Sequence, residues 1–190
     1  MKIRVYHFFI PINKLQEQAE SIGIPLYLIS FSAEGKNYEE KYQDAILHFK
    51  KLGVTHFIFG DIHLSEIKSY REKKLAPYSI EVLEPLWNKN SEEVINDFFE
   101  SGIKTKLIVT QADKLGEEYI GKTLTKPLVN NFPKGTDPCG EFGEYHTFAY
   151  AGGPFRFSID YPIKEIVKKT YPINLENGET AYTEFWQAII

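Results

Sequence analysis

The sequence lacks the residues that would build a disulfide framework or a zinc site based on thiolates. Its single cysteine, Cys139, cannot form an internal disulfide, and no second cysteine is present to share a metal ion. We therefore expect no structural zinc site and predict no metal-ligating residues.

Long apolar runs are also missing. No stretch approaches the roughly 20 apolar residues that a transmembrane helix needs. The N-terminal stretch MKIRVYHFFIPINKLQ has too short an apolar segment for a secretory signal, and it has no small-residue cleavage pattern. We expect a cytoplasmic protein with no membrane partner.

Positive charge is not in excess. The 22 Lys and Arg against 26 Asp and Glu give a formal net charge of -4, and there is no long basic run. This balance argues against nucleic acid as a direct partner. What is present is a hydrophobic share of 43% over 190 residues, which suffices for one core or two small domains.

The first half of the sequence alternates helix and strand signals, which predicts βαβ units and a parallel sheet. Gly23 and Gly53 end two helical patterns, and Asn37 has the capping-box spacing to Glu40. The predicted elements are a helix over 12–22, a buried strand over 24–31, a helix over 37–52, a strand over 55–62, a helix over 64–76 and a short strand around Val82 and Leu83.

The second half is predicted to be α+β. Its expected elements are a helix over 91–102, a strand over 104–111, a loop over 130–144, and strands over 145–152, 155–162 and 181–190. No low-complexity linker separates the halves. We predict a partial nucleotide-binding α/β domain over 1–89 and an α+β substrate-binding subdomain over 90–190.

Two segments are candidate sites. Ligands of parallel sheets bind beyond the carboxyl ends of the strands, which singles out Gly60, Asp61 and Ile62, with Tyr70 and Arg71 on the helix that follows. The alternative is an ordinary turn between a strand and a helix.

The second candidate is the stretch DPCGEFGEYHT. Its carboxylates Glu141 and Glu144 flank Gly143, and they can orient an ammonium group, bind Mg²⁺ or accept a proton. The alternative is a solvated hairpin. His146 is either catalytic or a hydrogen-bonded structural histidine, and Cys139 is expected to be a small buried residue.

Four strings, QAESIGIPL, GDIHLSEIKSYREKKL, LEPLW and DPCGEFGEYHTF, occur in this order. Together they resemble the PP-loop ATP pyrophosphatases of the diphthine-ammonia ligase type, from about residue 10 to about residue 160. The resemblance implies a Rossmann-like (HUP-type) parallel sheet, with ATP and Mg²⁺ as cofactors. It also implies an ATP-dependent amide ligase: a carboxylate acceptor, diphthine on an elongation factor, is adenylated with release of pyrophosphate, and ammonia then displaces AMP. A homodimer is one possible assembly.

The resemblance also assigns roles to residues. It implies catalytic roles for Glu141, Glu144 and His146. It places Asp137, Cys139, Gly140, Gly143 and Thr147 on the acceptor side and Gly60, Asp61, Ile62, Tyr70 and Arg71 on the nucleotide side.

Two features depart from that family. The Ser-Gly-Gly-Lys-Asp-Ser string that cradles pyrophosphate is absent, so we expect an N-terminally incomplete sheet with exposed apolar edges. Phe142 stands where Asn is common. The first interpretation is a shortened copy of a ligase. The alternatives are a catalytically inactive ATP- or substrate-binding module of the same family, and an unrelated metal hydrolase using Glu144 and His146, which the lack of further ligand spacing disfavours.

We predict that these 190 residues bind ATP weakly or not at all, because no Ser-Gly-Gly-Lys-Asp-Ser string is present to cradle the phosphates. Isothermal titration calorimetry with MgATP measures this directly, and micromolar affinity would contradict the prediction.

Overall fold

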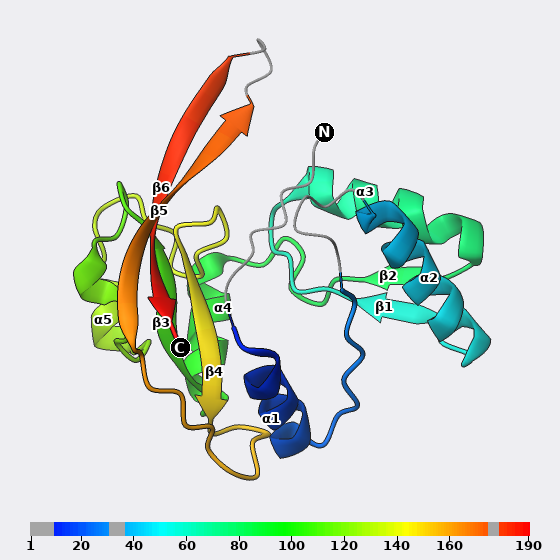
Figure 1. Cartoon of the computed structure of the whole chain (residues 1–190), viewed down its shortest axis with the longest axis horizontal. Helices are drawn as coiled ribbons and strands as arrows, with labels where there is room; N and C mark the ends of the chain where they lie inside the picture. Colours follow the sequence, from blue (N-terminus) through cyan, green and yellow to red (C-terminus); the bar gives the residue numbers. More distant parts are fainter. Residues whose placement is uncertain (1–9, 31–36, 175–178) are drawn as a thin grey trace. The chain divides into compact units, whose positions relative to one another are not determined.

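The computed structural model describes residues 10–30, 37–174 and 179–190. The chain divides into two compact units (Figure 1). The N-terminal unit, Leu26–Asn90, holds a small parallel sheet, and the C-terminal unit, the described residues of Met1–Pro25 with Ser91–Ile190, holds an antiparallel one. The mixed α/β class predicted from the sequence is confirmed.

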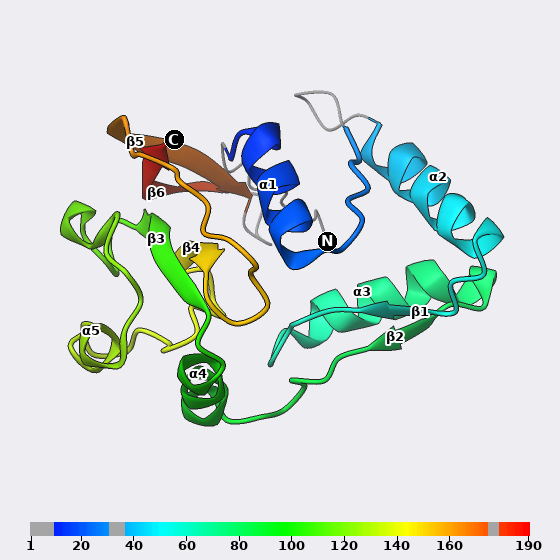
Figure 2. The same ribbon diagram turned by 90° about the horizontal axis from the view of Figure 1, so that it is seen from below.

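The N-terminal unit is a βαβ arrangement, as predicted. Strands β1 (His56–Ile58) and β2 (Glu81–Leu83) pair in parallel, and α3 (Ser65–Leu75) and the short helix η1 (Ala76–Tyr78) connect them. Figure 2 shows α3 running along this pair. Helix α2 (Tyr38–Lys51) contributes Ile46 to a core shared with Leu75 and Ile80.

The predicted strand over 24–31 is wrong for the described residues 24–30, which form no strand. Residue 31 lies outside the described part of the chain. Ile24, Leu26 and Leu28 are exposed. An apolar run forms a strand only where a neighbour accepts its backbone hydrogen bonds, and the described parallel sheet contains only β1 and β2.

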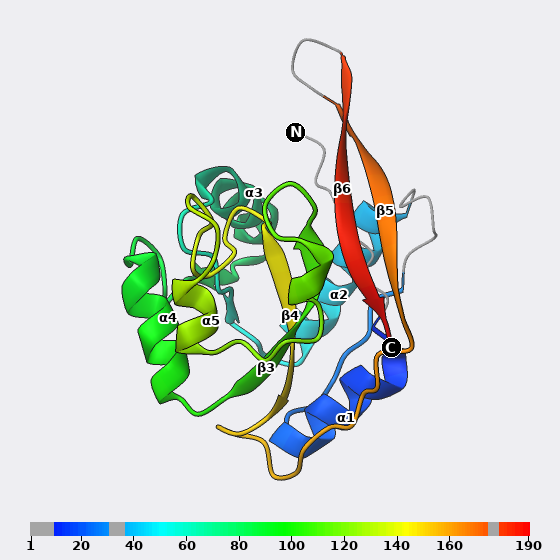
Figure 3. The same cartoon turned by 90° about the vertical axis from the view of Figure 1, so that its left-hand side faces the viewer.

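The C-terminal unit is built on a four-stranded antiparallel sheet in the order β4-β3-β6-β5. Figure 3 shows β5 and β6 as a long two-stranded ribbon. The elements of this unit are α1 (Ile12–Ile22), α4 (Ser91–Glu100), β3 (Lys104–Gln111), η2 (Glu117–Tyr119), α5 (Lys126–Asn130), β4 (Tyr145–Ala151), β5 (Glu165–Asn174) and β6 (Thr180–Ile189).

One strand of this sheet was predicted in the wrong place. Residues 155–162 alternate apolar and polar side chains but form no strand: the Arg156 N-H donates to Ser21 and the Ile159 N-H to Tyr150. The actual strand, β5, is an edge strand that includes two lysines and Pro172. Lysine and proline are typical of edges and weaken the sequence signal for a strand.

Both faces of the antiparallel sheet are covered by apolar side chains. Ile108, Val109 and Phe148 belong to one core cluster, and Leu107 and Tyr145 belong to another. None of the helices in the described ranges is long and apolar enough to cross a bilayer.

Helix α1 is fixed to the C-terminal unit by side-chain hydrogen bonds to backbone groups. The Ser21 hydroxyl donates to the Phe157 carbonyl (2.6 Å) and accepts from the Phe157 N-H (3.1 Å), and the Ser21 residue is 0% exposed. The Gln18 amide donates to the Ala149 carbonyl.

Replacement Ser21→Ala should lower the free energy of unfolding by about 1 kcal/mol, because the part-buried N-H and C=O of Phe157 lose their partner. Urea denaturation measures the loss. Gln16→Ala, an exposed change on the same helix, is the control and should change stability far less. Equal effects of the two changes would contradict the role given to Ser21.

Candidate functional site

The residues predicted from the sequence fall into two groups. Gly60, Asp61, Ile62, Tyr70 and Arg71 lie in the N-terminal unit, and the predicted residues from Asp137 to Thr147 lie in the C-terminal unit. Each group is described within its own unit.

The acidic stretch from Asp137 to Glu144, called here the glutamate loop, is organised by its last residue. Glu144 is only 3% exposed. Its Oε1 accepts from the Asp137 N-H (3.1 Å) and its Oε2 from the Phe142 N-H (3.1 Å). Both carboxylate oxygens are therefore used to tie one end of the loop to the other.

A second carboxylate shapes the loop from its start. The Asp137 Oδ1 accepts from the N-H groups of Cys139 (2.8 Å) and Glu141 (3.3 Å). Gly140 and Gly143 have φ values of +69° and +89°, as their glycine identity predicted. At Gly140 a Cβ would also lie 3.0 Å from the Tyr145 ring. The loop backbone is thus held in one shape before any ligand arrives.

The loop leaves two side chains for contact outside it. Phe142 is 64% exposed although its own N-H is fixed by Glu144. Glu141 is half-buried, next to it. The loop can therefore present one aromatic ring and one carboxylate from a fixed backbone.

Cys139 is a packing residue, as the sequence analysis expected. Burial, together with the neighbouring carboxylates Asp137, Glu141 and Glu92, raises the pKa of its thiol to about 12. The thiol donates to the Ser91 carbonyl (3.3 Å). A thiol in this state is not a nucleophile near neutral pH.

His146 and Thr147, predicted to act on one substrate, face opposite sides of the sheet. His146 pairs with Val109 and Thr147 with Leu107, and these partners belong to different core clusters. Burial lowers the pKa of His146 to about 4, so its imidazole is neutral near pH 7. A single acceptor cannot contact both side chains from the same face.

At the carboxyl end of β1, Asp61 forms an ion pair with Arg71 of α3. The Arg71 guanidinium also lies 4.0 Å from the centroid of the Phe59 ring. Ile62 is buried, and its carbonyl accepts from the Asn88 N-H (2.9 Å), which joins the loops after β1 and β2. The structure thus brings Gly60, Asp61, Ile62 and Arg71 together at this edge.

Tyr70 does not join them. Its hydroxyl donates to Glu39 of α2 (3.0 Å), which Lys74 also contacts. Burial and the hydrogen bond to Glu39 raise the pKa of Tyr70. Adjacent residues of a helix point about 100° apart, which explains why Tyr70 and Arg71 engage different elements.

Sequence reasoning missed a second ion pair at the same edge. Lys68 Nζ lies 3.1 Å from Glu84 Oε2, and it lies 4.4 Å from the centroid of the Trp87 ring. Two signals were available: Lys68 stands three residues before Arg71 on α3, and Glu84 directly follows β2 in the LEPLW string, much as Asp61 follows β1.

The residues of this edge fit the phosphates of a nucleotide, since two cations lie beyond the ends of parallel strands. No cluster of three acidic, histidine or cysteine ligands occurs in the described ranges. Mg²⁺ bound to ATP needs none, because it is usually held by one or two carboxylates together with phosphate oxygens and water.

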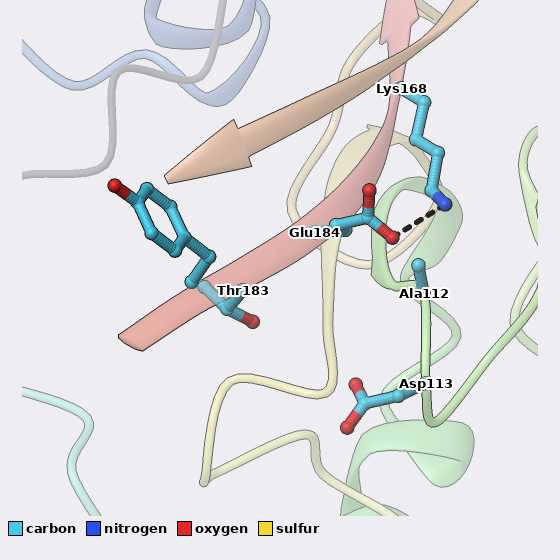
Figure 4. A pocket seen from close by; sticks show the side chains of 6 residues that line it. Ala112, Asp113, Lys168, Thr183 and Glu184 are labelled. Atoms are coloured by element: carbon cyan, nitrogen blue, oxygen red, sulfur yellow. Dashed lines mark ion pairs between the residues drawn. The ribbon is translucent and has the colours of Figure 1, made fainter. Parts of the chain in front are cut away.

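Two cavities lie away from the predicted residues. One, of about 260 Å³, is lined by Ala112, Asp113, Lys168, Tyr182, Thr183 and Glu184, and Figure 4 shows the Lys168–Glu184 ion pair at its wall. The other, of about 530 Å³, lies between α2, α3 and η1 and includes Glu39 and Tyr78 in its lining.

Comparison with known proteins supports the predicted resemblance. Residues 90–177 match the family model described as "Diphthamide synthase C-terminal domain". The chain is 28% identical over 167 residues to a human protein named diphthine-ammonia ligase, covering 78% of this chain and 62% of the relative. A Schizosaccharomyces pombe protein of the same name is 27% identical over 181 residues, covering 86% and 29%. A mouse relative is 28% identical, covering 68% and 55%.

The resemblance inferred from the four sequence strings is thus confirmed. The chain spans less than two thirds of the length of these three relatives, with shares of 62%, 29% and 55%.

Replacement Glu144→Gln should loosen the glutamate loop. The amide oxygen can accept from one of the two backbone N-H groups, but the amide NH₂ then faces the other N-H group, and two donors cannot bond to each other. We expect a cost of about 1–3 kcal/mol in local stability. Amide hydrogen exchange at Asp137 and Phe142 measures it and should accelerate at least about fivefold. Glu117→Gln, an exposed change in the same unit, should leave both rates unchanged; equal rates in the two variants would contradict the role of Glu144.

Protonation of His146 should destabilise the C-terminal unit. Its pKa is about 4 when folded and about 6.5 when unfolded, so the unfolded chain binds the proton first. Stability is full above pH 6.5 and falls towards pH 4, with a slope of up to about 1.4 kcal/mol per pH unit from this group. Urea titrations of the protein and of His146→Gln isolate the effect, and parallel pH profiles would contradict it.

Proposed function

We propose that the chain belongs to an ATP-dependent amide ligase of the diphthine-ammonia ligase type. The observation that carries this proposal is the match of residues 90–177 to the diphthamide synthase C-terminal domain, a range that includes the whole glutamate loop. The names of the relatives supply the reaction class: joining ammonia to the carboxylate of diphthine.

ATP supplies the leaving group that a carboxylate lacks. The acceptor carboxylate oxygen bonds to the α-phosphorus as pyrophosphate leaves; the nitrogen of ammonia then bonds to the acyl carbon, and AMP leaves as the carbon-oxygen bond breaks. Mg²⁺ and nearby cations would offset the phosphate charge.

The N-terminal unit would bind the nucleotide. Arg71, braced by Asp61 and stacked on Phe59, provides a fixed guanidinium at the carboxyl edge of the parallel strands. Its position suits a phosphate oxygen. Of the nucleotide-binding part predicted over 1–89, we propose the N-terminal unit, Leu26–Asn90, as the binding portion, with the HUP-type sheet that the resemblance implies.

The C-terminal unit, within residues 90–190, would bind the acceptor. The glutamate loop presents Glu141 from a backbone that Glu144 and Asp137 hold fixed. A carboxylate in this position can hold an ammonium ion and take the proton that amide formation releases. Glu144 then acts by positioning Glu141 and Phe142, and neutral His146 contributes at most a hydrogen bond. A cytoplasmic location and a homodimer are part of the same proposal.

The function is tested in a version of the protein that carries the Ser-Gly-Gly-Lys-Asp-Ser loop, because these 190 residues are predicted to bind ATP weakly or not at all. This version is incubated with ATP, Mg²⁺, ¹⁵N-ammonium and an elongation factor carrying diphthine. Expected products are AMP, pyrophosphate and labelled amide in equal amounts. Glu141→Gln should lower the rate of amide formation about 100-fold, and Glu117→Gln should leave it unchanged. In protein that turns over, Glu144→Gln should abolish amide formation while nucleotide binding is largely retained.

Production of ADP in place of AMP would contradict the ligase chemistry. ATP or acceptor binding without any AMP release would favour the alternative of an inactive binding module.

A further inference from the structure

The face of α3 directed at the ends of the parallel strands has two cations, one helical turn apart. Arg71 follows Lys68 by three positions on the helix, which places their Cβ atoms about 5–6 Å apart. Each is paired with an acid that follows a strand: Arg71 with Asp61 after β1, and Lys68 with Glu84 after β2. The two ion pairs repeat one arrangement on neighbouring strands.

Glu84 is the most deeply buried of these acids. Its side chain is 1% exposed, and neither oxygen accepts a hydrogen bond of normal geometry from any residue in the described ranges. Among the residues that the structure describes, only the Lys68 ammonium, 3.1 Å away, offsets its charge. Burying a carboxylate costs several kcal/mol unless a cation compensates it. The position of Lys68 is therefore constrained strongly by Glu84.

Lys68 itself is not buried with its partner. Its side chain is 28% exposed, against 1% for Glu84, so the ammonium lies on the solvent side of the carboxylate. The Lys68 ammonium has three N-H donors, and one side of it faces Glu84. Its other contact is with the ring of Trp87. No other side chain in the described part of the chain pairs with it. Donors remain for a ligand that approaches from solvent.

We propose that the Lys68 ammonium, held in place by Glu84, binds a phosphate group of a nucleotide at the carboxyl edge of β1 and β2. This rests on the proposed function for the identity of the nucleotide. The ligand class follows from the geometry: two braced cations one turn apart match the spacing of adjacent phosphates, and the edge is where parallel sheets bind ligands. The buried acid lies behind the cation and does not face the phosphate.

Trp87 gives a direct reporter because its ring lies 4.4 Å from the Lys68 Nζ. The sequence has two tryptophans, so Trp186→Phe leaves Trp87 as the only one. In this background, MgATP and adenosine are titrated separately into the millimolar range, and Trp87 fluorescence is followed.

Replacement Lys68→Gln should weaken MgATP binding about tenfold and leave adenosine binding unchanged, because adenosine has no phosphate. The paired change Lys68→Gln with Glu84→Gln removes both charges and guards against unfolding by an uncompensated carboxylate; it should show the same tenfold loss. Lys68→Arg should retain affinity. Lys73→Gln, an exposed change of equal charge on the same helix, should not alter it.

Equal weakening of MgATP and adenosine would assign Lys68 a purely structural role and overturn the inference. Unchanged MgATP affinity in the doubly substituted protein would overturn it while leaving the proposed function intact. No response of Trp87 to millimolar MgATP would overturn the inference alone, because the proposed function is judged by AMP release. The proposed function fails by itself if phosphate-dependent binding is seen but AMP is never released.

Discussion

The buried carboxylate of Glu144 is the interaction on which the glutamate loop depends. A carboxylate removed from water must be matched by hydrogen-bond donors, and a tight turn leaves backbone N-H groups without partners. Glu144 meets both needs at once by accepting from the Asp137 and Phe142 N-H groups. The loop consequently has a fixed shape, and Glu141 is presented from that fixed backbone.

At the edge of the parallel sheet, acids again fix their partners, but the partners are charged side chains rather than backbone N-H groups. Asp61 and Glu84 each anchor a cation of α3, so both cations are held on one helix face. Fixed donors lose less entropy on binding than mobile surface side chains do. In both units, therefore, an acid fixes the position of the group that is proposed to meet the ligand.

Some helices and strands could be predicted from the sequence, and others could not. The helix of Ile12–Ile22 and the strand of Lys104–Gln111 were predictable because their apolar spacing determines their burial. The position of β5 was not predictable, because the lysines and the proline of this edge strand weaken the apolar pattern. Residues 155–162 do alternate apolar and polar side chains, but their backbone N-H groups donate to the carbonyls of Ser21 and Tyr150 and they form no strand. Whether an alternating segment joins a sheet depends on distant partners.

The site shows the same division between local and distant information. Positive φ at Gly140 and Gly143 was predictable from residue type. The positions of Lys68, three residues before Arg71, and of Glu84, directly after β2, are visible in the sequence, but their pairing depends on how α3 packs on the strands. Similarly, Tyr70 and Arg71 are neighbours in sequence but engage different elements, since helix geometry turns them apart.

The strand that follows the glutamate loop limits how an acceptor can be bound. His146 and Thr147 face opposite sides of the sheet, so one acceptor cannot contact both, and Val109, which pairs with His146, is itself buried in the core. His146 is neutral near pH 7 because burial lowers its pKa to about 4. It therefore cannot offset phosphate charge or act as a protonated acid there. If the C-terminal unit binds the acceptor as proposed, the charge that acts on a nitrogen donor falls to the carboxylates of the glutamate loop, of which Glu144 and Asp137 also hold backbone N-H groups.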